Sequence, residues 1–320
     1  MTRHAVLPVV LAAAFLGGCS AAHHAARAHA RPRARQKLTV RTLGRLPAPL
    51  QLPAAAPLPG GRVLVLGGLS AADTSLDQIL ELRDGRAGAV GHLPTALHDA
   101  AAAAIGSSVY LFGGGESAGS SADIVLVGAT GEATTVGRLP AAASDVGAAT
   151  IGGTAYVVGG YTGVQPLRSV VAWRPGSRPR TAATLPQPLR YAAVAAVGGR
   201  LLVAGGTSGN ALTAAIVSVD PAAGRAGRVG SLPTAVTHAA GASLGGSLYV
   251  VGGRRSLLGR PTRTVLGVDP VSGRTWVAGR LPYALSDAAA VAQGSRILVV
   301  GGRDAAGRAR DEVLALEPRR

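Results

Sequence analysis

Short apolar runs that end in a Gly-Gly doublet recur along this chain of 320 residues. One of them is AYVVGG, residues 155–160, which either ends a buried strand or opens a phosphate-binding turn. The doublets occupy residues 67–68, 113–114, 159–160, 205–206, 252–253 and 301–302, at intervals of 46, 46, 46, 47 and 49 residues. A Leu-Pro pair precedes each doublet by 20 or 21 residues. The chain is therefore a sixfold repeat, and such periods are typical of propellers and solenoids.

The pattern inside each repeat predicts four short strands. Residues 99–114, DAAAAAIGSSVYLFGG, contain an Ala-rich run, a polar turn and an apolar run. Alanine favours helix, so a helix over 100–105 is the competing interpretation. Glycines recur too often for a helix of ten or more residues, however. After each doublet a loop leads to a third run, such as SVVAW at 169–173, and a fourth run reaches the next Leu-Pro.

The doublets are expected to end the second strand of each repeat. Continuous apolar sequence before them is typical of a strand that is covered on both faces. Glycine permits a positive φ and a close approach of neighbouring backbone. No Lys-Ser/Thr pair follows any doublet, which argues against a phosphate-binding loop.

This pattern resembles the Kelch repeat over residues 38–320. The matching features are the doublet, a tyrosine just before it (Tyr110, Tyr156, Tyr249), and Trp276 in one fourth strand. Most repeats lack the further Tyr and Trp that the family usually has. The resemblance implies an all-β fold, a six-bladed Kelch-type β-propeller with four antiparallel strands per blade.

The chain ends in a third run, DEVLALEPRR, so the last repeat lacks its fourth strand. The missing strand is at the N-terminus, where KLTVRTLGRLP at 37–47 aligns with RTWVAGRLP at 274–282. We therefore expect the N-terminal strand to complete the sixth blade, closing the ring and removing its open edges.

The N-terminus predicts export. Residues 1–18 combine Arg3 with an uncharged apolar run at 5–18, which is too short to span a bilayer and is typical of a signal peptide. The run ends in LGGC, which resembles a bacterial lipoprotein signal with lipidation at Cys19. We expect a lipid-anchored protein on the extracytoplasmic face of the cell membrane; an ordinary secretory signal is the alternative. Residues 19–37 are expected to be a basic, disordered tether, which either rests on anionic headgroups or is simply solvated.

Composition limits the core and the chemistry. Apolar residues make up 48% of the chain but aromatic residues only 3%, so the core must consist mainly of Ala, Val and Leu. Cys19 is the only cysteine, and no intrachain disulfide can form. The resemblance to Kelch proteins raises the possibility of copper chemistry of the galactose oxidase type. That chemistry needs a cysteine beside the metal, and it is excluded because Cys19 lies in the signal region.

Candidate ligand-binding residues follow from the resemblance, because Kelch propellers use the residue that opens each innermost strand to line the channel mouth. Counting 14 residues back from the doublets gives Asp99, Asp145, Tyr191, His238 and Asp287, with Leu52 or Pro53 out of phase in the first repeat. The flanking residues are His98, Ser144, Arg190, Thr237 and Ser286. Three interpretations stay open: polar caps that hold channel water, contacts to a sugar or peptide, and a cation site. We expect no cofactor and no specific metal.

The loops after the doublets should share the face of the channel mouth, and their charges divide that face into an acidic side and a basic side. The formal net charge is +16, and the later loops after the doublets are basic, with Arg254, Arg255 and Arg303 as the main candidates. Such a face suits a protein partner or an anionic or carbohydrate ligand, with a solvated basic surface as the alternative. Nucleic acid is not expected as a partner, because an exported protein is separated from it and because few aromatic side chains are present to stack on bases.

We therefore expect a binding or protein-interaction module without catalysis. The alternative is a sugar-processing enzyme of the Kelch epimerase (mutarotase) kind, with Arg190 and Asp99 or Asp145 as its channel residues. Fold alone does not decide between them.

Overall fold

The computed structural model describes residues 1–2 and 35–319, and the described part is built from β-strands and one 3-10 turn, η1 (Pro59–Gly61). The first strands are β1 (Leu38–Leu50), β2 (Ala54–Leu58), β3 (Arg62–Leu66), β4 (Leu76–Arg83), β5 (Arg86–Leu97), β6 (Ala101–Ile105), β7 (Ser108–Phe112), β8 (Gly115–Glu116), β9 (Gly119–Ser120), β10 (Asp123–Val127) and β11 (Ala133–Arg138). The middle strands are β12 (Gly147–Ile151), β13 (Thr154–Val158), β14 (Ser169–Trp173), β15 (Arg180–Thr184), β16 (Ala193–Val197), β17 (Arg200–Ala204), β18 (Thr207–Ser208), β19 (Ala211–Leu212), β20 (Ala215–Asp220) and β21 (Arg225–Ser231). The last strands are β22 (Ala240–Leu244), β23 (Ser247–Val251), β24 (Thr262–Val268), β25 (Thr275–Ser286), β26 (Ala289–Gln293), β27 (Arg296–Val300), β28 (Arg303–Asp304) and β29 (Arg310–Pro318).

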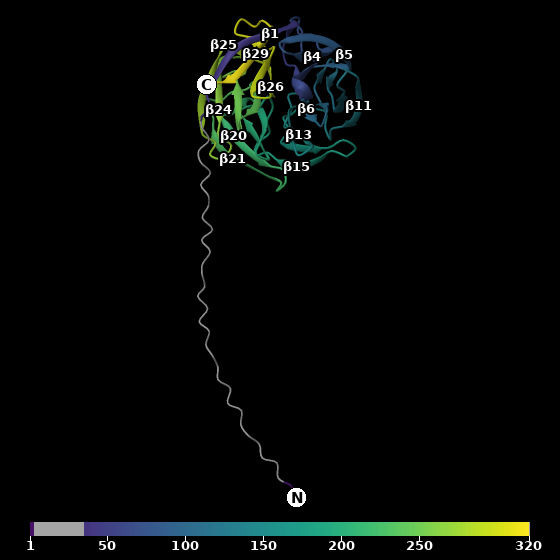
Figure 1. Ribbon diagram of the computed structural model, residues 1–320, viewed down its shortest axis with the longest axis vertical. Coiled ribbons are helices and arrows are strands. Elements are labelled where there is room, and N and C mark those ends of the chain that lie inside the picture. The colour runs from purple at the N-terminus through teal and green to yellow at the C-terminus, as the bar shows by residue number, and fades with distance from the viewer. Residues whose placement is uncertain (3–34, 320) are drawn as a thin grey trace. The chain divides into compact units, whose positions relative to one another are not determined.

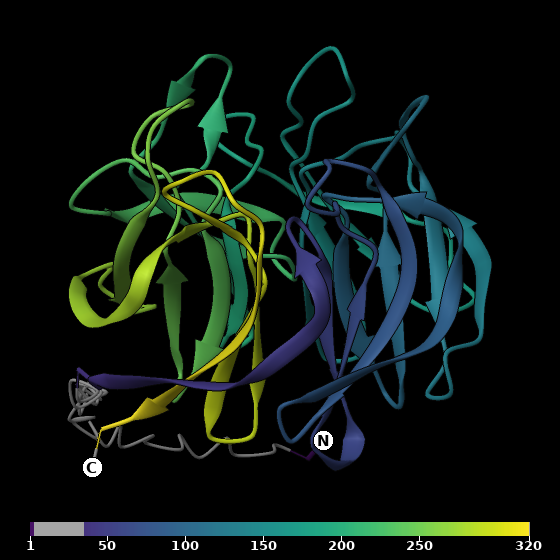
Figure 2. The same cartoon turned by 90° about the horizontal axis from the view of Figure 1, so that it is seen from above.

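The strands form antiparallel sheets in a propeller-like arrangement (Figures 1 and 2). Three sheets contain four strands, in the orders β11-β10-β7-β6, β12-β13-β14-β15 and β16-β17-β20-β21. A fourth has the order β22-β23-β24-β25-β28, and an eight-stranded sheet runs β2-β3-β4-β5-β1-β29-β27-β26. The two halves of this large sheet meet at one parallel pair, Arg45 opposite Arg86. The expectation of an all-β, propeller-like fold is confirmed at this level.

The structure contains the predicted strand, and not the competing helix, in the Ala-rich run of the second repeat. Residues 101–105 form β6 rather than a helix, because the run pairs along its whole length with β7, from Ala101 opposite Phe112 to Ile105 opposite Ser108. Pairing with a neighbouring strand stabilises a run of five residues more than the helix propensity of alanine does, because so short a helix is marginal in water.

The glycine doublets follow directly on the second strand of each repeat. At Gly159, φ is +62°, and a Cβ would lie 2.2 Å from the carbonyl oxygen of Leu189. The next amide, of Gly160, donates a hydrogen bond to that same oxygen at 2.9 Å. Only glycine allows both the left-handed backbone and this approach.

The Ala-rich first strand of each sequence repeat lies innermost, and these strands approach one another closely in neighbouring repeats. A Cβ on Gly241 of β22 would lie 2.5 Å from the backbone nitrogen of Val194 in β16. Small residues are therefore required there, as the composition suggests. The core is divided into six apolar clusters of described residues; five are packed between two neighbouring sheets, and the sixth lies between the two halves of the eight-stranded sheet.

The folded unit begins earlier than the predicted boundary at residue 38. The indole Nε1 of Trp276 donates to the carbonyl of Gln36 at 3.0 Å, and Lys37 Nζ donates to the carbonyl of Val277 at 2.8 Å. Residues 36 and 37 are therefore held by the sheet, and they do not belong to a tether. The compact unit starts at Arg35 and contains all six core clusters.

The predicted signal peptide 1–18, Cys19 and the tether up to residue 34 lie outside the described residues, apart from Met1 and Thr2. Within residues 1–2 and 35–319, no helix is long and apolar enough to cross a membrane.

Candidate functional site

Six residues, one from each sequence repeat, adopt the left-handed backbone conformation at the inner end of the sheets. Their φ values lie between 52° and 60°. The residues are Leu52, Asp99, Asp145, Tyr191, His238 and Asp287. Five of them are the residues that the repeat spacing predicts, and in the first repeat the position belongs to Leu52 and not to Pro53.

A closed ring of backbone hydrogen bonds joins these six residues. Each amide N–H donates to the carbonyl of the ring residue in the preceding repeat, at 2.9 Å from Asp145 to Asp99 and at 3.2 Å from His238 to Tyr191. The ring closes where Leu52 N–H donates to the carbonyl of Asp287 at 2.7 Å. We call this arrangement the backbone ring.

The backbone ring imposes its conformation on unfavourable residue types. Aspartate and histidine tolerate a positive φ better than most residues, but leucine and tyrosine do not. Such a conformation costs on the order of 1–3 kcal/mol per residue. Leu52 and Tyr191 therefore keep it because the hydrogen bonds on both sides of each residue demand it.

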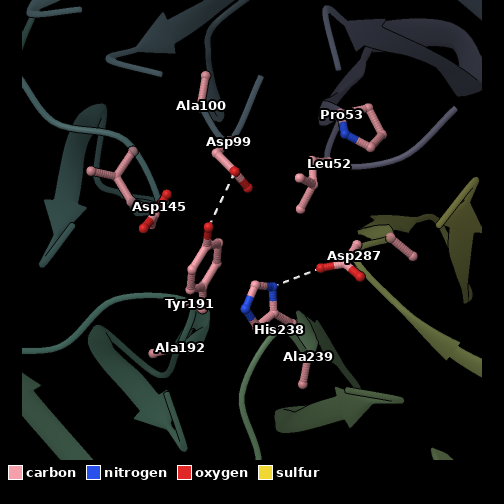
Figure 3. A pocket seen from close by; sticks show the side chains of 12 residues that line it. Leu52, Pro53, Asp99, Ala100, Asp145, Tyr191, Ala192, His238, Ala239 and Asp287 are labelled. Carbon is pink, nitrogen blue, oxygen red and sulfur yellow. Dashed lines mark hydrogen bonds and ion pairs between the residues drawn. The ribbon is translucent and has the colours of Figure 1, made fainter. Parts of the chain in front are cut away.

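The side chains of the backbone ring converge on a cavity of about 100 Å³ (Figure 3). Each ring residue and the small residue after it line this cavity. Tyr191 and His238 stack on one another with ring centroids 3.6 Å apart. The cavity therefore offers carboxyl groups, a phenol, an imidazole and an aromatic surface within one small space.

Asp287 lies in a compact network of donors. Its side chain is 1% exposed and accepts hydrogen bonds from His238 Nδ1 and Ser286 Oγ, both at 2.6 Å, and from Arg254 Nη2. Burial alone would raise the pKa of Asp287, but the hydrogen bond and charge of His238, together with Arg254 and Ser286, hold that pKa below its usual value. Asp287 is therefore an ionised, fully partnered carboxylate.

Asp145 is partnered by one arginine. Its Oδ2 lies 3.2 Å from Nη1 of Arg190, whose guanidinium also lies over the Tyr161 ring, 4.4 Å from the ring centroid. Burial nevertheless raises the pKa of Asp145, although Ser144 and Arg190 oppose this shift. One ion pair does not fully offset the loss of solvation.

Among the described residues, no arginine or lysine forms an ion pair with Asp99. Tyr191 Oη donates to its Oδ2 at 3.4 Å, and His98 Nε2 is 3.9 Å away. Burial raises the pKa of Asp99 well above its usual value, and the neighbouring Asp145 and Asp287 raise it further. Burial also lowers the pKa of His98, whose Nδ1 lies 2.9 Å from Ser75 Oγ. Asp99 is therefore the carboxyl of the backbone ring that most readily holds a proton.

The loops after the doublets share this face, as the sequence predicts. The residue after each doublet bridges to the residue before the backbone ring, for example Tyr161 to Ser144 and Thr207 to Arg190. Sequence reasoning missed Tyr161 and Thr207, the latter bonded to Thr237 through their hydroxyls at 2.8 Å. Their position directly after a doublet is the signal that could have identified them.

The predicted basic side is largely neutralised. Arg254 pairs with Asp287, and Arg303 Nη1 contacts Gln51 Oε1 at 3.2 Å and Asp73 Oδ1 at 3.3 Å. By contrast, Arg255 makes no ion pair or side-chain hydrogen bond with any residue that the structure describes. The formal charge count therefore overstates the positive potential of this face.

Among the described residues, no group of three or more His, Cys, Asp or Glu side chains is placed to hold a metal ion.

Comparison with known proteins identifies the repeat and the fold. The Kelch motif family model matches residues 142–178, which contain β12–β14 and the ring residue Asp145. A solved structure described as "Structure of YjhT" is similar with a TM-score of 0.73 and 16% sequence identity, covering 85% of this chain and 95% of that chain. At this identity the likeness shows the fold alone. A comparison with curated proteins gave no match.

The opposite pKa shifts in the backbone ring predict opposite effects of two similar substitutions. Because the folded state raises the pKa of Asp99, ionisation of Asp99 costs stability as pH rises, and Asp99→Asn should raise the melting temperature at pH 7. This gain should vanish below about pH 4, the usual range of an unfolded aspartate. Asp287→Asn should instead lower stability at pH 7 by about 3–5 kcal/mol, because it leaves buried cations unpaired.

Thermal melts at pH values from about 3 to about 8 check these expectations. Asp84→Asn is the matched control, since Asp84 also has a positive φ, 50°, but its side chain is 84% exposed. The electrostatic account is wrong if Asp99→Asn and Asp287→Asn shift the melt in the same direction at pH 7.

Proposed function

Since the chain is close to a Kelch-repeat β-propeller, we propose that it is a binding module whose ligand enters the cavity at the backbone ring. The observation that carries the proposal is the convergence of three carboxyl groups on one small cavity, two of them with raised pKa. Holding such groups together is unfavourable for folding, and perturbed ionisable groups in a cavity are typical of functional sites.

The chemistry of the cavity favours a small hydroxylated ligand, such as a monosaccharide. Arg254 and Arg190 compensate Asp287 and Asp145, and the raised pKa of Asp99 reduces the remaining negative charge. A nearly neutral site with many acceptors and donors suits hydroxyl groups better than an ion. The cavity of about 100 Å³ takes only one end of such a ligand, so the loops after the doublets would contact the rest.

Ligand-observed NMR with a panel of neutral, amino and acidic monosaccharides tests this proposal. The sample is the compact unit from residue 35, which contains its own core. At least one sugar should bind saturably, and the double substitution Asp99→Asn, Asp145→Asn should weaken it by about tenfold or more, through lost charge-assisted hydrogen bonds. Asp84→Asn should leave binding unchanged. No binding by any sugar, or equal binding by the double variant, would contradict the proposal.

A sugar-processing enzyme is the second candidate. It is favoured by Asp99, a carboxyl that readily holds a proton, beside the Asp145–Arg190 ion pair, because such a set can supply a general acid and a general base. The same NMR samples report the exchange rate between the anomers of a bound sugar. If the protein accelerates this exchange, and the acceleration disappears in Asp99→Asn while binding remains, catalysis is established. Binding without acceleration would instead support a binding module without catalysis.

We further propose that the fold has six blades and that β1 closes the ring. The support is the pairing of β1 with β29 from Leu38 opposite Pro318 to Leu50 opposite Arg310. The eight-stranded sheet then corresponds to two blades, β2-β3-β4-β5 and β26-β27-β29-β1, which touch at one residue pair. The sixfold sequence repeat agrees with this count.

Shortening the N-terminus tests the closure. A protein that begins at residue 45 lacks most of the pairing with β29 and the buried Leu38, so its melting temperature should fall by more than about 5 °C. A protein that begins at residue 38 is the control, since it loses only the contacts of Gln36 and Lys37. Equal melting temperatures for the two proteins would exclude closure by β1.

For the cellular location we propose an exported protein, anchored to the membrane through Cys19. The sequence LGGC supports lipidation.

Cys19→Ser should abolish incorporation of labelled palmitate and release the protein from the membrane fraction. An unlabelled parent protein, or a variant that stays in the membrane fraction, would refute the anchor. Because Cys19 is the only cysteine, no other thiol can substitute.

A further inference from the structure

A second cavity lies between one sheet and the linker that enters it from the preceding sheet, and it shares no lining residue with the cavity at the backbone ring. The linker after β21 forms one wall, and strands β23, β24 and β25 form the other. Its volume is about 230 Å³. The apolar lining residues include Val236, Val250 and Leu266, and the polar ones include Thr262, Arg255 and Arg280. We call it the inter-sheet groove.

The repeat provides an internal comparison. The equivalent gap between the linker after β11 and the sheet of β13, β14 and β15 has a volume of only about 50 Å³. Strand pairing aligns the two gaps residue by residue: Val158 lies opposite Val170, and Val251 lies opposite Val265. The loop from the doublet to the third strand is two residues longer at the inter-sheet groove, with ten residues from Gly252 to Thr262 against eight from Gly159 to Leu167. The difference between the gaps therefore comes from side chains and from this longer loop.

Three replacements distinguish the inter-sheet groove from the smaller gap in size and in charge. Arg280, opposite Thr264, holds the place of Thr184, opposite Ser169. Thr262 holds the place of Leu167, so a side chain that fills the smaller gap is shortened. Arg255, the second residue after its doublet, holds the place of Thr162, whose hydroxyl is bonded to the carbonyl of Gln165 in its own loop.

Neither Arg255 nor Arg280 has an ion-pair or side-chain hydrogen-bond partner in the described part of the chain. Other arginines on the same side of the molecule do have partners, such as Arg254 with Asp287 and Arg310 with Glu312. Two cations beside an apolar gap, with no acidic neighbour, leave a positive site that protein groups do not compensate.

We propose that the inter-sheet groove binds an amphiphilic carboxylate, a small molecule with one carboxylate head and a short apolar tail. The guanidinium groups of Arg255 and Arg280 bind the head, since arginine pairs with carboxylates through charge-assisted hydrogen bonds. The tail packs on Val236, Val250 and Leu266, where it is removed from water. This site is separate from the sugar site at the backbone ring.

Titration of the compact unit with octanoate, followed by ligand-observed NMR, tests the proposal. Octanol lacks the charge and acetate lacks the tail, so each should bind at least about tenfold more weakly than octanoate. The double substitution Arg255→Gln, Arg280→Gln should weaken octanoate binding by a similar factor. Arg178→Gln removes an exposed arginine from the connection between β14 and β15 and should have no effect.

Thr262→Leu separates shape from charge. It restores the residue of the equivalent gap, so it should fill the inter-sheet groove and abolish octanoate binding while both arginines remain. Melting curves verify that each variant is folded. The proposal is overturned if the parent does not bind octanoate, if octanol binds equally well, or if either the double arginine variant or Thr262→Leu retains full affinity.

Discussion

The closed ring of six backbone hydrogen bonds is the constraint on which the rest of this structure depends. Each ring residue donates to the repeat before it and accepts from the repeat after it, so the inner ends of all repeats are fixed at one spacing. That spacing brings the first strand of each repeat so close to its neighbours that glycine is required at positions such as Gly147 and Gly241, which face Val194. It also forces a left-handed backbone on each ring residue, which directs the side chains into one cavity.

The cavity combines groups that stabilise the fold with groups that do not. Asp287 receives hydrogen bonds from three donors and is a structural anion, whereas Asp99 shares a small space with two other carboxyls and forms no ion pair with any arginine or lysine among the described residues. Polar caps that only held channel water would not require three carboxyl groups around one cavity of about 100 Å³. The unfavourable carboxyl, rather than the satisfied one, is therefore the stronger indication of ligand binding.

Internal repetition makes departures from the pattern informative. Where two repeats share the same strand register, a difference between their side chains cannot be attributed to the fold. Tyr161 and Thr207 occupy equivalent positions after their doublets, yet one lies under Arg190 and the other bonds to Thr237. The inter-sheet groove is likewise a local variation on a gap that is smaller beside β13, β14 and β15, where Leu167 lines it.

The sequence by itself determined the repeat, the strand content and five of the six ring residues, because doublet spacing and apolar runs are local properties of the chain. It also identified the small residues that the inner strands require. It could not determine that Arg254 reaches Asp287, or that Arg303 reaches Gln51, because these partners are 33 and 252 residues apart. Charges on different repeats compensate one another only after the tertiary structure sets their distances. Among the described residues, the tertiary structure alone therefore decided that Asp287 and Asp145 pair with arginines while Asp99 does not.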